Sequence, residues 1–174
     1  ERKMYVTGGV GSAHQGEKFT ADYDLPNESA YAETCAAIGL VFFAHRMLQI
    51  EADGKYADVL ERALYNGVLS GVSVRGDRFF YVNPLASAGG HHRQEFFGCA
   101  CCPPNLARLV AELGSYVYAT SGNALYVNLY IGGEGETELA GWPVTLRQET
   151  CYPWQGGVEL TVGLGQPTKF DLRL

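Results

Sequence analysis

The sequence has 174 residues, of which 47% are hydrophobic and 18% are charged, a balance that excludes a disordered chain and fits one ordinary domain or two small ones. With 19 acidic and 13 basic side chains the formal net charge is -6. This charge argues against nucleic acid and anionic membrane surfaces as partners, because both attract an excess of Lys and Arg. No apolar run reaches the roughly 18 residues that span a bilayer, so we expect no transmembrane helix.

The first 33 residues predict an extended loop, because Gly, Asp, Asn and Pro recur throughout them. A loop of this length within a compact domain is usually functional. The chain starts at Glu1 without an initiator Met and without the pattern of a signal peptide. We therefore expect this sequence to be a piece of a longer protein.

Two helices are predicted next. Residues 34–52 are apolar nearly all round in their first two turns, which predicts a helix buried on most sides and stopped by Asp53 and Gly54. Residues 55–70 carry a single apolar stripe, which predicts a helix with one face in water. This alternation is found in a helical toroid and also in other layered helical folds.

The following stretch predicts a short strand and one more helix. Residues 78–82 have strand-forming side chains after a Gly76-Asp77 turn. Pro103 and Pro104 open a helix that Gly114 ends, because proline suits the first helical turn.

From Tyr116 onward the helical period is lost and short strands are predicted. A Ser121-Gly122-Asn123 turn indicates a hairpin. The predicted strands are residues 116–119, 124–130, 142–149, 157–162 and 169–174. The expected fold class is therefore mainly α and then β, with a boundary near residue 115.

The chain has five cysteines, three of which lie within four positions: Cys99, Cys101 and Cys102. Adjacent cysteines fit disulfide geometry poorly with each other, so a reduced chain with a metal or a reactive thiol is favoured over a disulfide framework. A reduced chain is typical of the cytoplasm, which is the predicted location. Cys151 is expected to be a small buried hydrophobic residue.

Two groups of soft-metal ligands stand out, Glu33-Thr34-Cys35 and Cys99-Ala100-Cys101-Cys102. Thiolates and a carboxylate suit four-coordinate Zn²⁺. Residues two apart on a helix point about 200° away from each other, so Glu33 and Cys35 can share a metal only where the chain is not yet helical. This places the helix start at Thr34 or Cys35, with Thr34 as the N-cap, and puts both groups at helix N-termini, where the dipole favours thiolate.

Four motifs resemble the β-L-arabinofuranosidases of glycoside hydrolase family 127 and their relatives in family 146. They are Gly16-Glu17-Lys18-Phe19-Thr20, Tyr23-Asp24-Leu25-Pro26-Asn27, Tyr31-Ala32-Glu33-Thr34-Cys35-Ala36 and Phe97-Gly98-Cys99-Ala100-Cys101-Cys102-Pro103-Pro104-Asn105. The resemblance implies that residues 1–115 are the C-terminal part of an (α/α)₆ barrel. It implies that residues 116–174 are the first strands of a β-sandwich. Family members are several times longer than this chain.

The resemblance also implies a zinc centre and a nucleophile. The ligands of its Zn²⁺ cofactor fall on Glu33, Cys35, Cys101 and Cys102. The first cysteine of the vicinal pair, Cys101, matches the nucleophile. Zinc keeps a thiol deprotonated at neutral pH, so a thiolate can replace the carboxylate nucleophile of an ordinary retaining glycosidase.

The remaining roles concern the sugar. By resemblance, Glu17 matches the general acid/base and Tyr81 a tyrosine that lines the sugar subsite. His14 lies near Glu17 in the sequence and is a candidate for contacts with substrate hydroxyls. The predicted function is retaining hydrolysis that releases β-L-arabinofuranose from glycans or glycoconjugates. The predicted partners are this carbohydrate and, for the full-length protein, a second copy in a homodimer.

Two other readings stay open. In the first, the cysteines only fix a zinc-stabilised scaffold or interaction domain without activity. In the second, Cys101 pairs with His91 or His92 in a metal-free Cys–His hydrolase. The role of Cys99 is left open as well.

Overall fold

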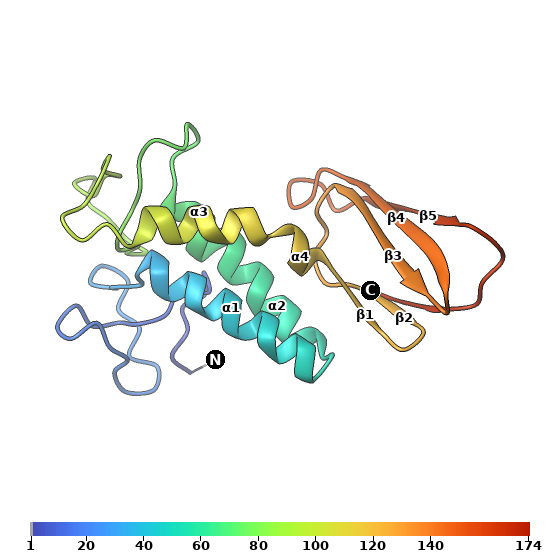
Figure 1. Ribbon diagram of the computed structural model, residues 1–174. Helices are drawn as coiled ribbons and strands as arrows, with labels where there is room; N and C mark the ends of the chain where they lie inside the picture. The colour runs from blue at the N-terminus through green and yellow to red at the C-terminus, as the bar shows by residue number, and fades with distance from the viewer. Residues whose placement is uncertain (1) are drawn as a thin grey trace. The chain divides into compact units, whose positions relative to one another are not determined.

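The computed structural model describes residues 2–174, which form two compact units, Glu1–Ala111 and Glu112–Leu174. The first unit is made of helices joined by long irregular segments, and the second is made mainly of β-strands (Figure 1). The predicted order of a helical part followed by a β part therefore agrees with the structure.

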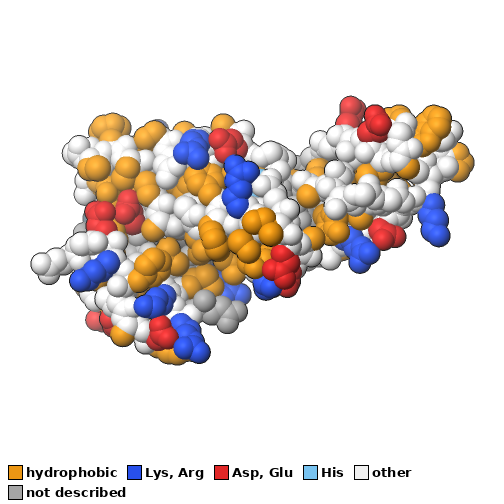
Figure 2. Space-filling model, turned by 60° about the horizontal axis from the view of Figure 1, so that its bottom comes forward, with side chains coloured by type: hydrophobic (Ala, Val, Ile, Leu, Met, Phe, Trp, Pro, Cys, Tyr) orange, Lys and Arg blue, Asp and Glu red, His pale blue; other side chains and the backbone are white. Residues whose placement is uncertain are grey.

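Helix α1 (Thr34–Ile50) confirms the first predicted helix and ends two residues earlier than expected. Its buried residues form one stripe: Thr34, Ala37, Ile38, Val41 and Ala44. Phe43 is 59% exposed and Ile50 is 80% exposed. The expectation of burial on most sides is wrong for residues 2–174, because no element within them covers this second apolar face. Apolar side chains reach the surface of the molecule in Figure 2 as well.

The second predicted helix begins as α2 (Gly54–Arg62), continues as a π-helix, η1 (Ala63–Val68), and ends as a 3₁₀ turn, η2 (Leu69–Gly71). α2 and η1 pack against α1. Two glycines allow this close approach. A Cβ on Gly67 would lie 3.0 Å from Ala37 Cβ, and a Cβ on Gly71 would lie 2.7 Å from Thr34 Oγ1.

The strand predicted at residues 78–82 is not present in the described chain. Phe79 forms isolated bridges with Val72 and Gln94, and Val82 forms one with Glu33. Residues 78–82 therefore make single backbone bridges to three separate segments and do not form a strand. These contacts connect the irregular stretch to the start of α1.

Helix α3 (Cys102–Glu112) begins one residue before the Pro103-Pro104 pair and buries Cys102, Leu106 and Leu109. Gly114 does not end it. Gly114 instead starts the single turn α4 (Gly114–Val117).

Two three-stranded sheets make up most of the second unit. The strands are β1 (Tyr118–Ser121), β2 (Ala124–Val127), β3 (Gly133–Leu139), β4 (Trp142–Thr150), β5 (Val158–Leu164) and β6 (Asp171–Arg173). The sheet orders are β1-β2-β6 and β3-β4-β5, and only the β2–β6 pair is parallel. One buried cluster draws Leu125 and Val127 from the first sheet and Leu139, Val144 and Leu146 from the second.

The predicted hairpin is confirmed by the antiparallel pairing of β1 with β2 around Gly122. Strand β3 was not predicted. Its sequence, Gly-Glu-Gly-Glu-Thr-Glu-Leu, has few strand-forming side chains, and its full register with β4 holds it in the sheet.

Candidate metal centre and active site

The four ligand residues converge in the first unit. One ligand atom from each of Glu33, Cys35, Cys101 and Cys102 lies within 4.8 Å of all the others. The sulfur atoms of Cys35 and Cys102 are 3.5 Å apart, and those of Cys101 and Cys102 are 3.7 Å apart. Glu33 Oε1 lies 3.4 Å from Cys101 Sγ and 3.9 Å from Cys102 Sγ.

These donors fit a zinc ion. Three thiols and one carboxylate are a ligand set that Zn²⁺ accepts in a four-coordinate site. A tetrahedron with metal–sulfur bonds of about 2.3 Å has sulfur–sulfur edges of about 3.8 Å. The two sulfur–sulfur distances of 3.5 and 3.7 Å are close to this value.

The start of α1 is held by the segment before Pro84. Glu33 is the residue before the helix, with φ -59° and ψ 138°. Thr34 N–H donates to Tyr81 O at 2.9 Å, and the Thr34 hydroxyl donates to Phe80 O at 2.8 Å. The Asn83 side-chain amide donates to Thr34 Oγ1 at 3.0 Å. The helix therefore begins at Thr34 as predicted, but the prediction that Thr34 is the N-cap is wrong, because its hydroxyl is used to attach another segment.

The second ligand pair lies where α3 begins. Cys102 is the first residue of the helix and is buried, whereas Cys101 precedes it. Asn105 N–H donates to Cys101 O at 3.2 Å, and this bond holds Cys101 at the N-terminus of α3.

Burial decides the protonation of two of the thiols in the absence of a metal. It raises the pKa of the Cys35 thiol to about 11 and raises the pKa of the Cys102 thiol further, and their contact with each other adds to the rise for Cys102. The helix dipole favours thiolate, but loss of hydration outweighs it here. These cysteines are therefore neutral thiols at pH 7 unless a cation displaces their protons.

Glu17 lies in an exposed tight turn of the N-terminal loop. Its backbone is left-handed, with φ 46°, and its N–H donates to His14 O at 3.2 Å. The hydroxyl of Tyr31 donates to Glu17 Oε1 at 2.7 Å. The ring of His14 lies edge-on to the ring of Tyr31, with centroids 4.9 Å apart. Tyr31 thus brings Glu17 and His14 to the segment that carries Glu33.

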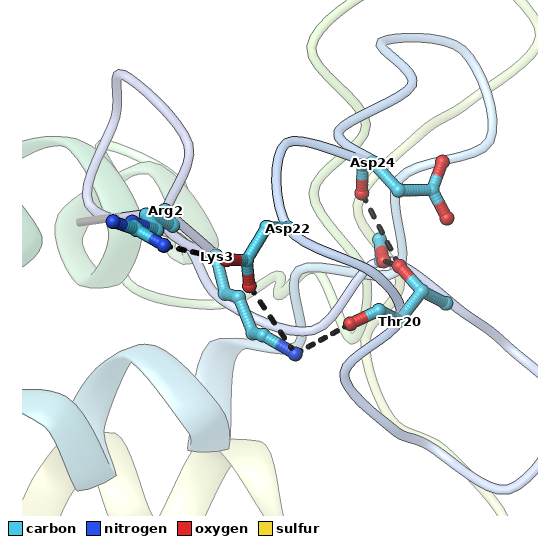
Figure 3. A network of polar contacts seen from close by, with 6 residues as sticks. Arg2, Lys3, Thr20, Asp22 and Asp24 are labelled. Carbon is cyan, nitrogen blue, oxygen red and sulfur yellow. Dashed lines mark hydrogen bonds and ion pairs between the residues drawn. The ribbon is translucent and has the colours of Figure 1, made fainter.

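Polar contacts hold this loop at its base (Figure 3). Arg2 pairs with Asp22 at 3.2 Å, and Lys3 Nζ donates to Thr20 O at 2.7 Å. The Thr20 hydroxyl donates to Asp24 O at 3.3 Å. Thr20 and Asp22, which follow the Glu17 turn, are therefore tied to Lys3 and Arg2 near the start of the chain.

Tyr81 lies beside Cys101. The neighbouring Cys101 thiol raises the pKa of the Tyr81 phenol, and burial raises it further. Its ring centroid is 6.3 Å from that of Tyr31 and 5.5 Å from that of Phe97. The structure thus brings Tyr81 together with Cys101 and, through Tyr31, with Glu17.

His91 has other partners. Its Nε2 lies 2.9 Å from Val82 O, and its ring stacks on Phe80 with centroids 4.6 Å apart. Cys101 Sγ contacts Glu33 and Cys102 instead. This arrangement favours a metal centre over a Cys–His pair.

An open cavity of about 650 Å³ has His14 and His91 in its lining beside Glu28 and Val82, and the four ligand residues are not among those that line it. Its size suits a small ligand, and its polar groups suit a hydroxylated one.

Sequence reasoning assigned no role to Tyr31 and Phe97, which only begin two of the motifs, and none to Asn83, because nothing in their spacing marks a contact between separate loops. It was wrong about Cys151, which is exposed, and Cys99 is exposed as well. No helix within residues 2–174 has the length and hydropathy that a membrane crossing requires.

Comparison with known proteins assigns the chain to a class. Residues 1–115 match the family model described as "Beta-L-arabinofuranosidase, GH127 catalytic domain", and residues 124–174 match the corresponding "GH127 middle domain". Because the first match alone covers more than half of the chain, the chain belongs to glycoside hydrolase family 127.

Individual relatives agree. The chain is 43% identical over 191 residues to the non-reducing end β-L-arabinofuranosidase of Bifidobacterium longum subsp. longum, covering 99% of this chain and 29% of that protein. A GH127 β-L-arabinofuranosidase from Geobacillus stearothermophilus T6 has a TM-score of 0.94 at 54% identity, covering 98% of this chain and 29% of that one. A further GH127 β-arabinofuranosidase structure has a TM-score of 0.91 at 50% identity, covering 93% of this chain and 26% of that one. The chain therefore spans less than a third of the length of these relatives.

Proposed function

We propose that this chain is the catalytic centre of a retaining β-L-arabinofuranosidase with Cys101 as nucleophile and Glu17 as general acid/base. The observation that carries the proposal is the convergence of three thiols and one carboxylate within 4.8 Å, in a chain of this family. A scaffold domain would need neither a tyrosine beside Cys101 nor a hydrogen bond from Tyr31 to Glu17, and both are present here.

The metal proposed for this centre is zinc, held by Glu33, Cys35, Cys101 and Cys102. When bound, zinc supplies positive charge that keeps sulfur ligands deprotonated at neutral pH. Burial makes Cys35 and Cys102 neutral thiols in the metal-free protein, so a bound cation would be needed to keep them ionised at neutral pH.

In the first step, Cys101 sulfur attacks the anomeric carbon of the sugar. The sulfur–carbon bond forms as the bond to the glycosidic oxygen breaks, and the carboxyl proton of Glu17 moves to that oxygen. Tyr81, which lies beside Cys101, orients the sulfur and contacts the sugar. The product is a thioglycosyl enzyme and the free aglycone.

In the second step, Glu17 takes a proton from water, whose oxygen attacks the anomeric carbon. The carbon–sulfur bond breaks, Cys101 regains its negative charge, and the sugar leaves with retained configuration. We assign His14 to contacts with sugar hydroxyls, because it lines the cavity and its ring also contacts the ring of Tyr31.

We extend the proposal to the full-length protein. Residues 1–115 would complete an (α/α)₆ barrel together with preceding helices, and residues 116–174 would begin a β-sandwich. Free cysteines at all five positions are consistent with the reducing cytoplasm. The homodimer and the exclusion of nucleic acid stay predictions from the sequence.

The test is Cys101→Ser in the full-length protein, assayed on an aryl β-L-arabinofuranoside with zinc measured in the same sample. We expect a loss of at least about a thousandfold in kcat, because a nucleophile is removed. Cys151→Ser is the matched control, since Cys151 is exposed and lies in the second unit. Activity that survives Cys101→Ser with zinc retained would support the scaffold reading or another nucleophile.

A further inference from the structure

Tyr31 contacts both Glu17 and Tyr81, the tyrosine beside Cys101. The Tyr31 hydroxyl donates to Glu17 Oε1 at 2.7 Å. Its ring centroid lies 6.3 Å from that of Tyr81. Tyr31 is therefore the side chain through which the N-terminal turn reaches the residues around Cys101.

Tyr31 is itself held firmly. It is 8% exposed, and its carbonyl accepts from Asn83 N–H at 3.2 Å. The next residue, Ala32, has a left-handed backbone with φ 38°, donates to Gly11 O at 2.8 Å and accepts from the Asn83 side chain at 2.9 Å. These three hydrogen bonds to Gly11 and Asn83 thus offset the strain of a left-handed alanine. A rigid anchor is what a positioning role requires.

Glu17 is in the opposite situation. It is exposed, and its own left-handed backbone, φ 46°, lies in a turn that follows Gly16. A long side chain in such a turn samples several rotamers unless a partner selects one. The bond from Tyr31 is the contact that selects an orientation for the carboxylate.

We propose that Tyr31 is a positioning residue for Glu17, fixing Oε1 with its hydroxyl so that Oε2 exchanges the proton with the glycosidic oxygen and with water. This inference rests on the proposed function of Glu17 as acid/base. It adds a residue that acts through Glu17 and takes no proton from the substrate itself.

The activity test is Tyr31→Phe in the full-length protein, with kcat/KM measured on methyl and 4-nitrophenyl β-L-arabinofuranosides. Methoxide is a poor leaving group that needs the proton of Glu17, whereas nitrophenolate leaves with little help. We expect kcat/KM to fall about tenfold to a hundredfold on the methyl glycoside and less than about threefold on the nitrophenyl glycoside. Equal losses on both substrates overturn the proposal, because they indicate a general structural effect.

The matched control is Tyr5→Phe. Tyr5 is also buried in the first unit, in a cluster with Ala30 and Ala32, and its hydroxyl donates to Pro26 O at 3.3 Å. We expect this variant to keep the wild-type ratio of the two kcat/KM values. A change of the ratio in Tyr5→Phe as large as in Tyr31→Phe contradicts a specific role for Tyr31.

Crystal structures of full-length wild type and Tyr31→Phe give a readout that needs no activity. We expect the Glu17 carboxylate to leave its position in the variant while the ring at position 31 stays against His14. An unchanged carboxylate overturns the proposal. A wild type that hydrolyses neither glycoside contradicts the proposed function instead, and the two crystal structures then decide the Tyr31 contact by themselves.

Discussion

At the scale of the residue, burial sets the properties of the thiols more strongly than their place at a helix end. It raises the pKa of Cys35 to about 11 and that of Cys102 beyond the range of ordinary thiols. A metal that binds them must displace their protons, so the affinity for zinc rises with pH through neutrality.

We therefore expect zinc added to metal-free full-length protein at pH 7 to release at least about two protons per ion. Calorimetry in buffers of different ionisation enthalpy measures this number. In Cys35→Ser the release should be about one proton smaller, since one neutral thiol is removed. Release of less than one proton per zinc would show that these thiols are already ionised.

At the scale of the element, the site depends on how η2 approaches the first turn of α1. Gly71 faces Thr34, the residue between Glu33 and Cys35. A Cβ at this position would lie 2.7 Å from Thr34 Oγ1 and 2.9 Å from Thr34 Cγ2. Glu33 and Cys35 thus flank Thr34, and the contact of Thr34 with position 71 leaves no room for a side chain larger than the hydrogen of glycine.

Gly71→Ala is expected to destabilise the protein by about 1–3 kcal/mol through overpacking and to weaken zinc binding, because Thr34 must move. Gly39→Ala is the control within α1, where an added Cβ meets nothing within 4 Å. This control should stabilise the helix by about 0.5–1 kcal/mol. Thermal unfolding with and without zinc measures both effects. A Gly71→Ala protein as stable as Gly39→Ala would contradict the packing argument.

At the scale of the whole molecule, this chain carries the proposed nucleophile, acid/base and metal ligands but less than a third of the length of its relatives. One apolar face of α1, which includes Phe43 and Ile50, is exposed within residues 2–174. Such a face in a helical fold is ordinarily covered by another helix.

We expect full-length protein to hydrolyse an aryl β-L-arabinofuranoside and residues 1–174 alone to be weakly active or inactive. The physical reason is that residues 1–174 alone would lack the preceding helices proposed to complete the barrel around the substrate, and one apolar face of α1 would stay exposed. Both proteins are assayed at equal zinc occupancy, so that a loss of metal is not mistaken for the effect of the missing helices. Equal rates would refute this account.

Local pattern was sufficient for much of the fold and for the choice of ligand residues. The period of the apolar side chains predicted the spans of α1 and of the α2–η1–η2 segment to within two residues. The Ser121-Gly122-Asn123 turn predicted the β1–β2 hairpin, but the first strand begins at Tyr118 and not at Tyr116, because Tyr116 and Val117 belong to α4. It predicted a strand at 78–82 and missed β3, because both cases depend on which segments pair across the chain. The ligand residues were found because each group lies within a few positions of the sequence, Glu33 two residues from Cys35 and Cys101 next to Cys102, and the resemblance assigned these four to the zinc site.

The sequence by itself determined which side chains are available: three thiols, a carboxylate and the glutamate of a glycine-rich turn. Tertiary structure alone decided that the three thiols and the Glu33 carboxylate meet, since Cys35 and Cys102 are brought to 3.5 Å across a separation of 67 residues. It also decided that the Tyr31 hydroxyl donates to Glu17 and that the Thr34 hydroxyl donates to Phe80 O and does not cap the helix. The reason is that hydrogen-bond partners and hydration depend on distant segments folding together, and no local pattern encodes that proximity.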